Sequence, residues 1–140
     1  MHSLAFRAAI VVATLGSAAG CVRVVREPTL PALQGRVVLG DTPVAGARIL
    51  VTKQRGTAAC QDMRLAASTA ADGSFEFEGE RAFVLVPVAG DPTPTWEVCV
   101  EYDGVVHPGY RPFGFGLQDK VQLACDIGKT PTHPFEGICE

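Results

Sequence analysis

The amino-acid sequence predicts an all-β protein, a seven-stranded antiparallel β-sandwich. From Gly35 onward, apolar residues recur mostly at every second position, as in strands with one buried face. Gly, Pro, Asp and Thr interrupt this alternation, and no segment has a convincing helical period. Many short strands with turns at intervals of roughly 8–12 residues are typical of a sandwich or barrel.

Four of the strands are expected before residue 80. The second of them places Ala47, Ile49 and Val51 on one side, as a half-buried strand does. Directly before the fourth, Asp72-Gly73 predicts a hairpin turn, because glycine tolerates the positive φ that such turns need. The four segments are 35–39, 47–52, 65–69 and 75–78.

Three further strands are expected over 82–88, 95–102 and 121–127. The first is a continuous apolar run that ends in proline and glycine. In the second, Trp96, Val98 and Val100 share one side, and the opposite side carries two glutamates and Cys99. In the last strand Cys125 lies on the apolar side.

The composition predicts one folded domain. The chain has 140 residues, of which 47% are hydrophobic and 19% charged, so a single core is expected. Without residues 1–20, which hold one cation, 11 Lys and Arg face 15 Asp and Glu, and the formal charge is −4. No run of basic residues is present, so we expect no nucleic-acid partner.

The first twenty residues predict a signal peptide that is removed. Arg7 is followed by an uncharged, mostly apolar stretch, and only fifteen residues separate it from Arg23. A membrane-spanning helix needs roughly 20 residues. The small residues Ala18-Ala19-Gly20 stop directly at Cys21, and this segment resembles the lipobox of bacterial lipoproteins, although Ala18 stands where that family prefers leucine.

The lipobox resemblance implies cleavage before Cys21, a diacylglycerol on its thiol and an acylated new amino terminus, which together suffice for stable anchoring. Val22 rather than aspartate after the cysteine implies the outer membrane, facing the periplasm, by similarity to Gram-negative sorting. The alternative is an ordinary secretory signal cut after Ala19 or Gly20, which leaves Cys21 as a thiol. Residues 21–33 are expected to be a lipidated, semi-rigid tether, because Pro28 and Pro31 fix the backbone.

Three motifs in the first half of the domain carry a family resemblance. They are Leu33-Gln34-Gly35-Arg36-Val37, Pro43-Val44-Ala45-Gly46-Ala47-Arg48-Ile49 and Thr69-Ala70-Ala71-Asp72-Gly73-Ser74-Phe75. Their order and spacing resemble the carboxypeptidase regulatory-like domain. The resemblance covers roughly residues 33–78 and implies a transthyretin-like (prealbumin-like) seven-stranded sandwich, here over 34–128, followed by a Pro-rich tail over 129–140.

Four cysteines remain besides Cys21, namely Cys60, Cys99, Cys125 and Cys139. An even number in an exported protein predicts two disulfides, and no Cys-x-x-Cys motif indicates a redox or zinc site. Four cysteines allow three pairings. Because Cys99 is expected on an outward face and Cys125 on an inward one, we favour Cys60 with Cys99 and Cys125 with Cys139, which would tie down the tail.

Motifs for catalysis, metals or cofactors are not found in the sequence. His107 and His133 each precede a proline, which favours surface or turn roles, and Glu76, Glu78 and Glu80 fit a solvated strand face better than a calcium site. Transthyretin-like hydrolases of a purine-degradation intermediate end in Tyr-Arg-Gly-Ser, whereas this chain ends in Gly-Ile-Cys-Glu. We therefore expect no enzyme, no cofactor and no metal.

Aromatic residues form the most suggestive group for binding. Tyr110, Phe113 and Phe115 lie in a glycine-rich segment and, with Trp96, could stack on a sugar or on a partner's side chain, or else cap the sandwich. The favoured function is a non-catalytic, lipid-anchored module that binds or scaffolds another envelope component, protein or glycan. The alternative is a carbohydrate-binding module with the same sandwich topology, and a hydrolase ranks last.

Overall fold

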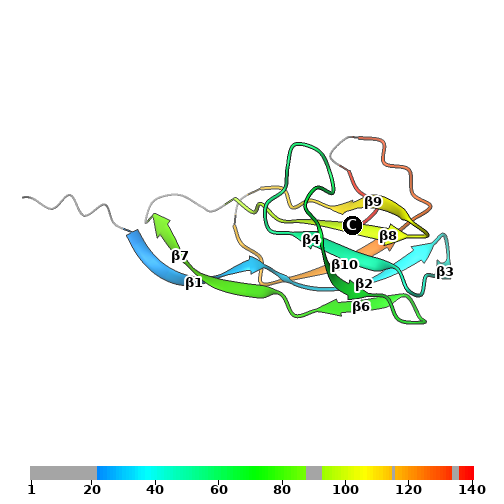
Figure 1. Cartoon of the computed structure of the whole chain (residues 1–140), viewed down its shortest axis with the longest axis horizontal. Helices are drawn as coiled ribbons and strands as arrows, with labels where there is room; N and C mark the ends of the chain where they lie inside the picture. The colour runs from blue at the N-terminus through cyan, green and yellow to red at the C-terminus, as the bar shows by residue number, and fades with distance from the viewer. Residues whose placement is uncertain (1–21, 88–92, 115, 134–135) are drawn as a thin grey trace, which may run out of the picture.

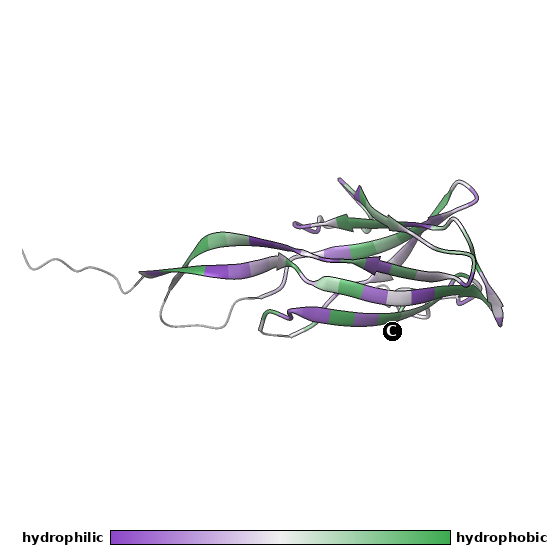
Figure 2. Ribbon diagram, turned by 90° about the horizontal axis from the view of Figure 1, so that it is seen from below, coloured by the Kyte–Doolittle hydropathy of each residue, from purple (hydrophilic) through white to green (hydrophobic). Residues whose placement is uncertain are grey.

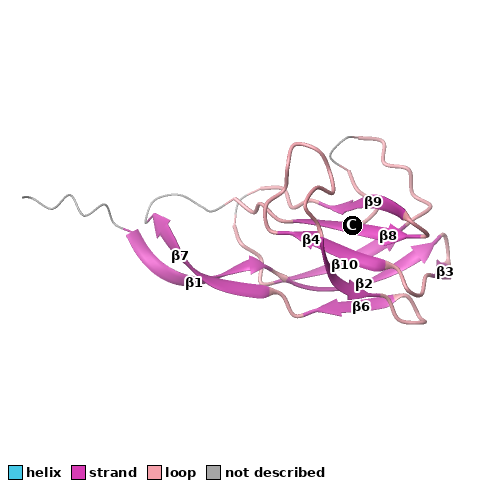
Figure 3. Ribbon diagram, in the orientation of Figure 1, coloured by secondary structure: helices cyan, strands magenta, loops and turns pink. Residues whose placement is uncertain are grey.

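The computed structural model describes residues 22–87, 93–114, 116–133 and 136–140 (Figure 1). Within these ranges the protein is all-β, as predicted: two four-stranded sheets and a two-stranded ribbon, with no helix (Figure 3). No helix long and apolar enough to span a membrane is therefore found in this part of the chain. The predicted signal peptide, Cys21 and Phe115 lie outside the described residues.

The first sheet contains β6 (Ser74–Phe77), β2 (Ala32–Leu39), β10 (Lys120–Asp126) and β3 (Thr42–Pro43). β2 runs antiparallel to β6 and β3 but parallel to β10, with Ala32 opposite Lys120 and Val38 opposite Asp126. The prediction of a purely antiparallel arrangement is therefore wrong at this pair. All of the second sheet lies between β2 and β10 in the chain, so no tight turn forces the two strands to run in opposite directions.

The second sheet has the order β5 (Arg64–Ser68), β4 (Arg48–Thr52), β8 (Glu97–Tyr102) and β9 (Val105–Tyr110), and all its pairs are antiparallel. β9 was not expected, because Pro108 and Gly109 interrupt its pattern. Its position at the edge of the sheet accommodates a proline, which has no N–H to donate. His107, expected in a loop, lies on this strand opposite Val100.

One hydrophobic core joins the two sheets. Apolar side chains from both sheets belong to a single buried cluster, as the alternation in the sequence predicted. The first sheet contributes Leu33, Val37, Phe75, Val121, Leu123 and Cys125, and the second sheet and the residue before it contribute Ile49, Val51, Trp96, Val98 and Val100. The core therefore lies between the two sheets, which form separate layers in Figure 2.

The turn at Asp72-Gly73 is present, but it does not form a hairpin. The N–H of Gly73 donates to the carbonyl of Ala70 at 2.9 Å, and Gly73 has a φ of 79°, which favours glycine. The strands on either side belong to different sheets: β5 pairs with β4, and β6 pairs with β2. The turn therefore carries the chain from one layer to the other.

A ribbon of two strands extends away from the sheets (Figure 1). It consists of β1 (Val22–Leu30) and β7 (Glu80–Pro87), which pair antiparallel along nearly their whole length. The segment expected to be a single-stranded tether is thus extended but paired. Its backbone N–H and C=O groups, which in a free spacer would bond to water, bond to β7 instead. Together with β3 and β9, β1 raises the number of strands from the predicted seven to ten among the described residues.

The C-terminal residues bridge the open edges of both sheets. Ala124 of β10 and Glu140 donate to each other's carbonyls at 2.8 and 3.0 Å, while Ile138 and Cys139 donate to the carbonyls of Pro108 and Gly109 in β9. A Cβ atom at Gly137 would lie 1.8 Å from the Gly109 carbonyl oxygen, so this close approach requires glycine. Residues 137–140, called the C-terminal clasp below, thus close one side of the molecule.

Candidate functional site

Both predicted disulfides are present. Cys60 bonds to Cys99 with an S–S distance of 2.04 Å, and Cys125 bonds to Cys139, which lies opposite it in the clasp. The reason given for this pairing holds, but the outward face of β8 is not exposed to solvent. Cys99 does lie on the face of β8 away from the core, but that face is covered and the residue is buried. The covering segment is the β4–β5 loop (residues 53–63), which carries Cys60.

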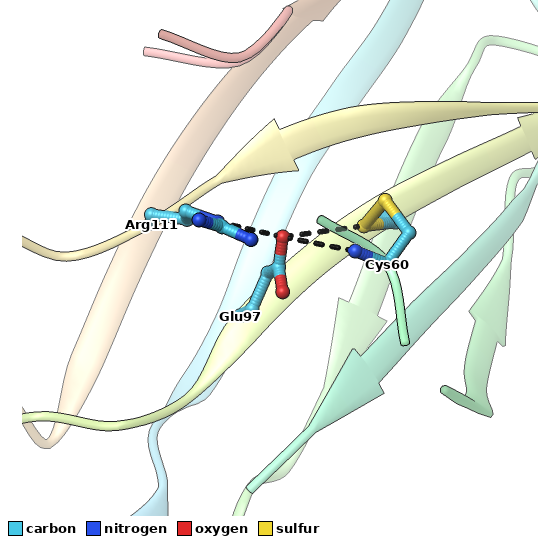
Figure 4. The surroundings of a disulfide bond; sticks show 4 residues. Cys60, Glu97 and Arg111 are labelled. Atoms are coloured by element: carbon cyan, nitrogen blue, oxygen red, sulfur yellow. Dashed lines mark hydrogen bonds and ion pairs between the residues drawn. A yellow bond between two sulfur atoms is a disulfide. The ribbon is translucent and has the colours of Figure 1, made fainter. Parts of the chain in front are cut away.

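A buried ion pair lies beside the Cys60–Cys99 disulfide (Figure 4). Glu97 has no exposed surface, and its Oε1 accepts a hydrogen bond from Nε of Arg111 at 2.8 Å and from the backbone N–H of Cys60 at 3.2 Å. Within the described residues, Oε2 of Glu97 and Nη2 of Arg111 have no hydrogen-bond partner. The pair therefore fixes the loop and Arg111 against β8 while one polar atom of each residue stays unsatisfied.

The sequence pattern placed Glu97 on a solvated face, so this pair was missed. Alternation along a strand says which residues share a face, but it cannot say that a loop covers that face. Side-chain atoms of Cys60, Glu97 and Cys99 also lie within 4.8 Å of one another, as metal ligands do. Because both sulfurs are consumed in a disulfide, they cannot act as thiolate ligands, and Arg111 already neutralises the carboxylate.

The predicted aromatic group is only partly brought together. Trp96 is buried, with 3% of its surface exposed, and its ring centroid lies 5.6 Å from that of Tyr110 at an interplanar angle of 32°. Phe113, in contrast, is 81% exposed. Trp96 and Tyr110 thus pack together at the core, and the buried Trp96 offers no open ring face for stacking.

A cleft of about 330 Å³ lies where the ribbon meets the sheets. Its size falls at the lower end of the range for small-molecule sites, roughly 300–1,000 Å³. The lining is mainly apolar, with a few hydroxyl and charged groups near it. Residues that line it include Thr29, Val84, Pro94, Thr95, Trp96 and Leu117. One side of this cleft therefore includes a residue that the sequence had singled out, Trp96.

Ion pairs join Lys53, which lines the cleft, to the start of β7. The carboxylate of Glu80, at the start of β7, contacts Nζ of Lys53 at 2.5 Å and also pairs with Arg64. The hydrogen bond from Lys53, together with the nearby Arg64 guanidinium, holds the pKa of Glu80 below its usual range. Lys53 also accepts a hydrogen bond through its carbonyl from the Thr95 hydroxyl at 2.8 Å. The cleft is thus bordered by side chains with fixed partners.

Comparison of the chain with models of known protein families, with curated proteins and with solved structures finds no match. Any functional assignment therefore rests on the geometry of the cleft and of the buried pair alone. The cleft offers a mainly apolar surface, which suits an apolar group of a ligand or partner. His107 and His133 do not line it: His107 is half-buried on β9 and His133 is exposed in the tail.

Proposed function

We propose that this chain is an exported lipoprotein, anchored through Cys21 in the outer membrane and facing the periplasm, that acts as a non-catalytic binding module for another component of the cell envelope. The disulfides support export, because such bonds persist in oxidising compartments and are rare in the cytosol. Three of the four half-cystines, Cys99, Cys125 and Cys139, are buried, so both bonds belong to the folded core and not to a reactive surface.

The fold proposed for the domain is the transthyretin-like sandwich of carboxypeptidase regulatory-like domains. Two four-stranded sheets around one core support it. Burial of Val37, Ala47 and Phe75 in the core and the positive φ of Gly73 in a tight turn also support it. The ribbon and the C-terminal clasp are additions outside the seven-stranded plan.

The cleft at the base of the ribbon is the proposed binding site, and it is the observation on which the binding function rests. It combines the size of a ligand site with a mainly apolar lining that also includes Thr29 and Thr95. A partner that inserts an apolar side chain or acyl group fits this chemistry better than a sugar, since Trp96 has its ring buried against Tyr110.

Mass spectrometry of the mature amino terminus tests the anchor. The chain isolated from its host is expected to begin at Cys21 and to carry the mass of a diacylglycerol and an acyl group. A Cys21→Ser chain is the control and is expected in the soluble fraction without these groups. A wild-type chain that retains residues 1–20, or that begins with a free thiol, contradicts the lipoprotein proposal.

Photo-crosslinking in intact cells tests the binding site. A photoreactive residue in place of Thr95, which is exposed at the cleft, is expected to capture a discrete partner. The matched control is the same residue in place of Gln122, which is exposed on β10, and Leu117→Asp should abolish capture from position 95. Equal capture at both positions, or capture that survives Leu117→Asp, contradicts the cleft as the site, and a captured glycan supports the carbohydrate-binding alternative.

A further inference from the structure

One face of the ribbon exposes large apolar side chains. Directly opposite residues of an antiparallel pair share a face, and the pairs here are Val24 with Leu85 and Arg26 with Phe83. Val24, Phe83 and Leu85 are 66%, 75% and 72% exposed. We call these four residues the ribbon face, and Figure 2 shows hydrophobic segments on both of its strands.

The opposite side of the ribbon begins with the exposed Arg23 but is half-buried over its next two pairs. There Val25 and Val84 form one pair and Glu27 and Ala82 the next, and all four residues are half-buried. The only carboxylate of these pairs is thus on the side away from the ribbon face. The other ribbon carboxylate, Glu80, is held by Lys53 and Arg64.

Positive charge accompanies the apolar residues on the ribbon face. Arg26 takes part in none of the ion pairs formed among the described residues. Arg81 follows it on the same side, opposite Pro28, and pairs with Asp119. A surface whose own four residues combine exposed Val, Leu and Phe with arginine and include no carboxylate has the chemistry of an interfacial segment, which buries apolar groups below the headgroups and places cations at the phosphates.

We propose that the ribbon face lies on the lipid bilayer, with Val24 and Phe83 in the headgroup region and Arg26 at lipid phosphates, while Leu85, which also lines the cleft, stays available to it. This inference rests on the proposed function, because the anchor supplies the geometry. β1 begins at Val22, the residue next to Cys21, and neighbouring Cα atoms are about 3.8 Å apart. Acyl chains on Cys21 therefore hold this end of the ribbon at the membrane, where its exposed apolar side chains lose contact with water.

Photo-crosslinking on vesicles tests this contact. The acylated chain is reconstituted into vesicles of phosphatidylethanolamine and phosphatidylglycerol with p-benzoylphenylalanine in place of Phe83. The control carries the same residue in place of Tyr102, which is 37% exposed at the end of β8 far from the ribbon (Figure 1). Both positions are aromatic and exposed, so neither substitution removes core packing. Irradiation is expected to give phospholipid adducts at position 83 and none at position 102, as read by mass spectrometry.

The outcomes separate this inference from the proposed function. An acylated, vesicle-bound chain that gives no lipid adduct at position 83 overturns the ribbon contact and leaves the anchor intact. Crosslinked dimers in place of lipid adducts show that a second copy covers the face, which also overturns it. If mass spectrometry of the same sample finds no acyl groups, the lipoprotein proposal itself fails. Substituting Arg26→Glu in the photoreactive chain is expected to reduce the adducts, because it opposes the lipid phosphates.

Discussion

Glu97 of β8 forms a buried ion pair with Arg111. Its carboxylate is shielded from water, and Arg111 and the Cys60 backbone bind one of its two oxygens. The other oxygen and one nitrogen of Arg111 lack partners within the described chain. A buried pair of this kind contributes little net stability, but removal of one member leaves the other as an unpaired buried charge.

Removal of Arg111 should therefore be costly. Arg111→Met is expected to lower the free energy of unfolding by about 3–5 kcal/mol, and adding Glu97→Leu should restore most of it, because the charge is then gone. The measurement is urea unfolding followed by Trp96 fluorescence. Arg48→Met is the matched control. It breaks an exposed pair with Glu101, which lies on β8 like Glu97, and should cost less than about 1 kcal/mol. Similar losses in both single variants would refute the argument.

Glu80 should make stability depend on pH in the acid range. Its hydrogen bond from Lys53 and the charge of Arg64 lower its pKa in the folded state. The folded state then binds the proton less tightly than the unfolded state, so the stabilisation is complete above the unfolded pKa of about 4.3 and is lost as the pH falls through the lowered folded value.

The stability difference between wild type and Glu80→Gln is the quantity to measure. It should be constant near neutral pH and shrink as the pH falls below about 4.3. Glu78→Gln, at an exposed position outside the described ion pairs, controls for the loss of one negative charge. A difference that grows towards acid pH would mean that Glu80 is not stabilised as a carboxylate.

At the scale of elements, the sequence predicted strands well and their partners poorly. Each of the seven predicted segments forms a strand, because alternation is a local property of the chain. β9 was missed since Pro108 and Gly109 break its pattern, and β1 was missed since two prolines indicate a spacer. Which strand pairs with which depends on contacts distant in the chain: the Asp72-Gly73 signal predicted a turn correctly but could not show that the turn joins two sheets.

The candidate site was predictable only in part. Strand parity led to the correct disulfide pairing, and Trp96 was singled out before the cleft was known. The other walls of the cleft come from β1, β7 and residue 117, and no sequence pattern places these segments together. Burial of Glu97 likewise follows from a loop that folds over β8 from elsewhere in the chain.

The C-terminal clasp should depend on its disulfide. Replacing Cys125 and Cys139 with alanine opens a ring of 15 residues and is expected to cost about 3 kcal/mol. Amide hydrogen exchange should then accelerate at residues 138–140 and at the β10 amides of Ala124 and Asp126, whose hydrogen bonds reach the clasp. Replacing Cys60 and Cys99 with alanine instead should not open the clasp locally. Its amides should then exchange only through global unfolding. Unchanged exchange at the clasp in the first variant would show that packing of Ile138 alone suffices.

At the scale of the whole molecule, one core couples both sheets. Trp96, the sole tryptophan, belongs to the same buried cluster as Leu33 of the first sheet and Val98 of the second. A core shared in this way should melt as one unit. Thermal unfolding curves from Trp96 fluorescence and from far-ultraviolet circular dichroism are expected to coincide. A fluorescence transition well below the circular dichroism transition would show that the end of the core near the cleft opens by itself.

The parallel pairing of β2 with β10 and the clasp that follows it also determine when folding can finish. During translation, β2 emerges before all strands of the second sheet and β10 emerges after them, so the first sheet stays incomplete until the ribosome has passed residue 126. Residues 137–140 must then follow before the edges of β9 and β10 are covered. Pairing between segments so far apart in the chain requires a long loop to close first, so the parallel pair and the clasp are expected to form late in folding.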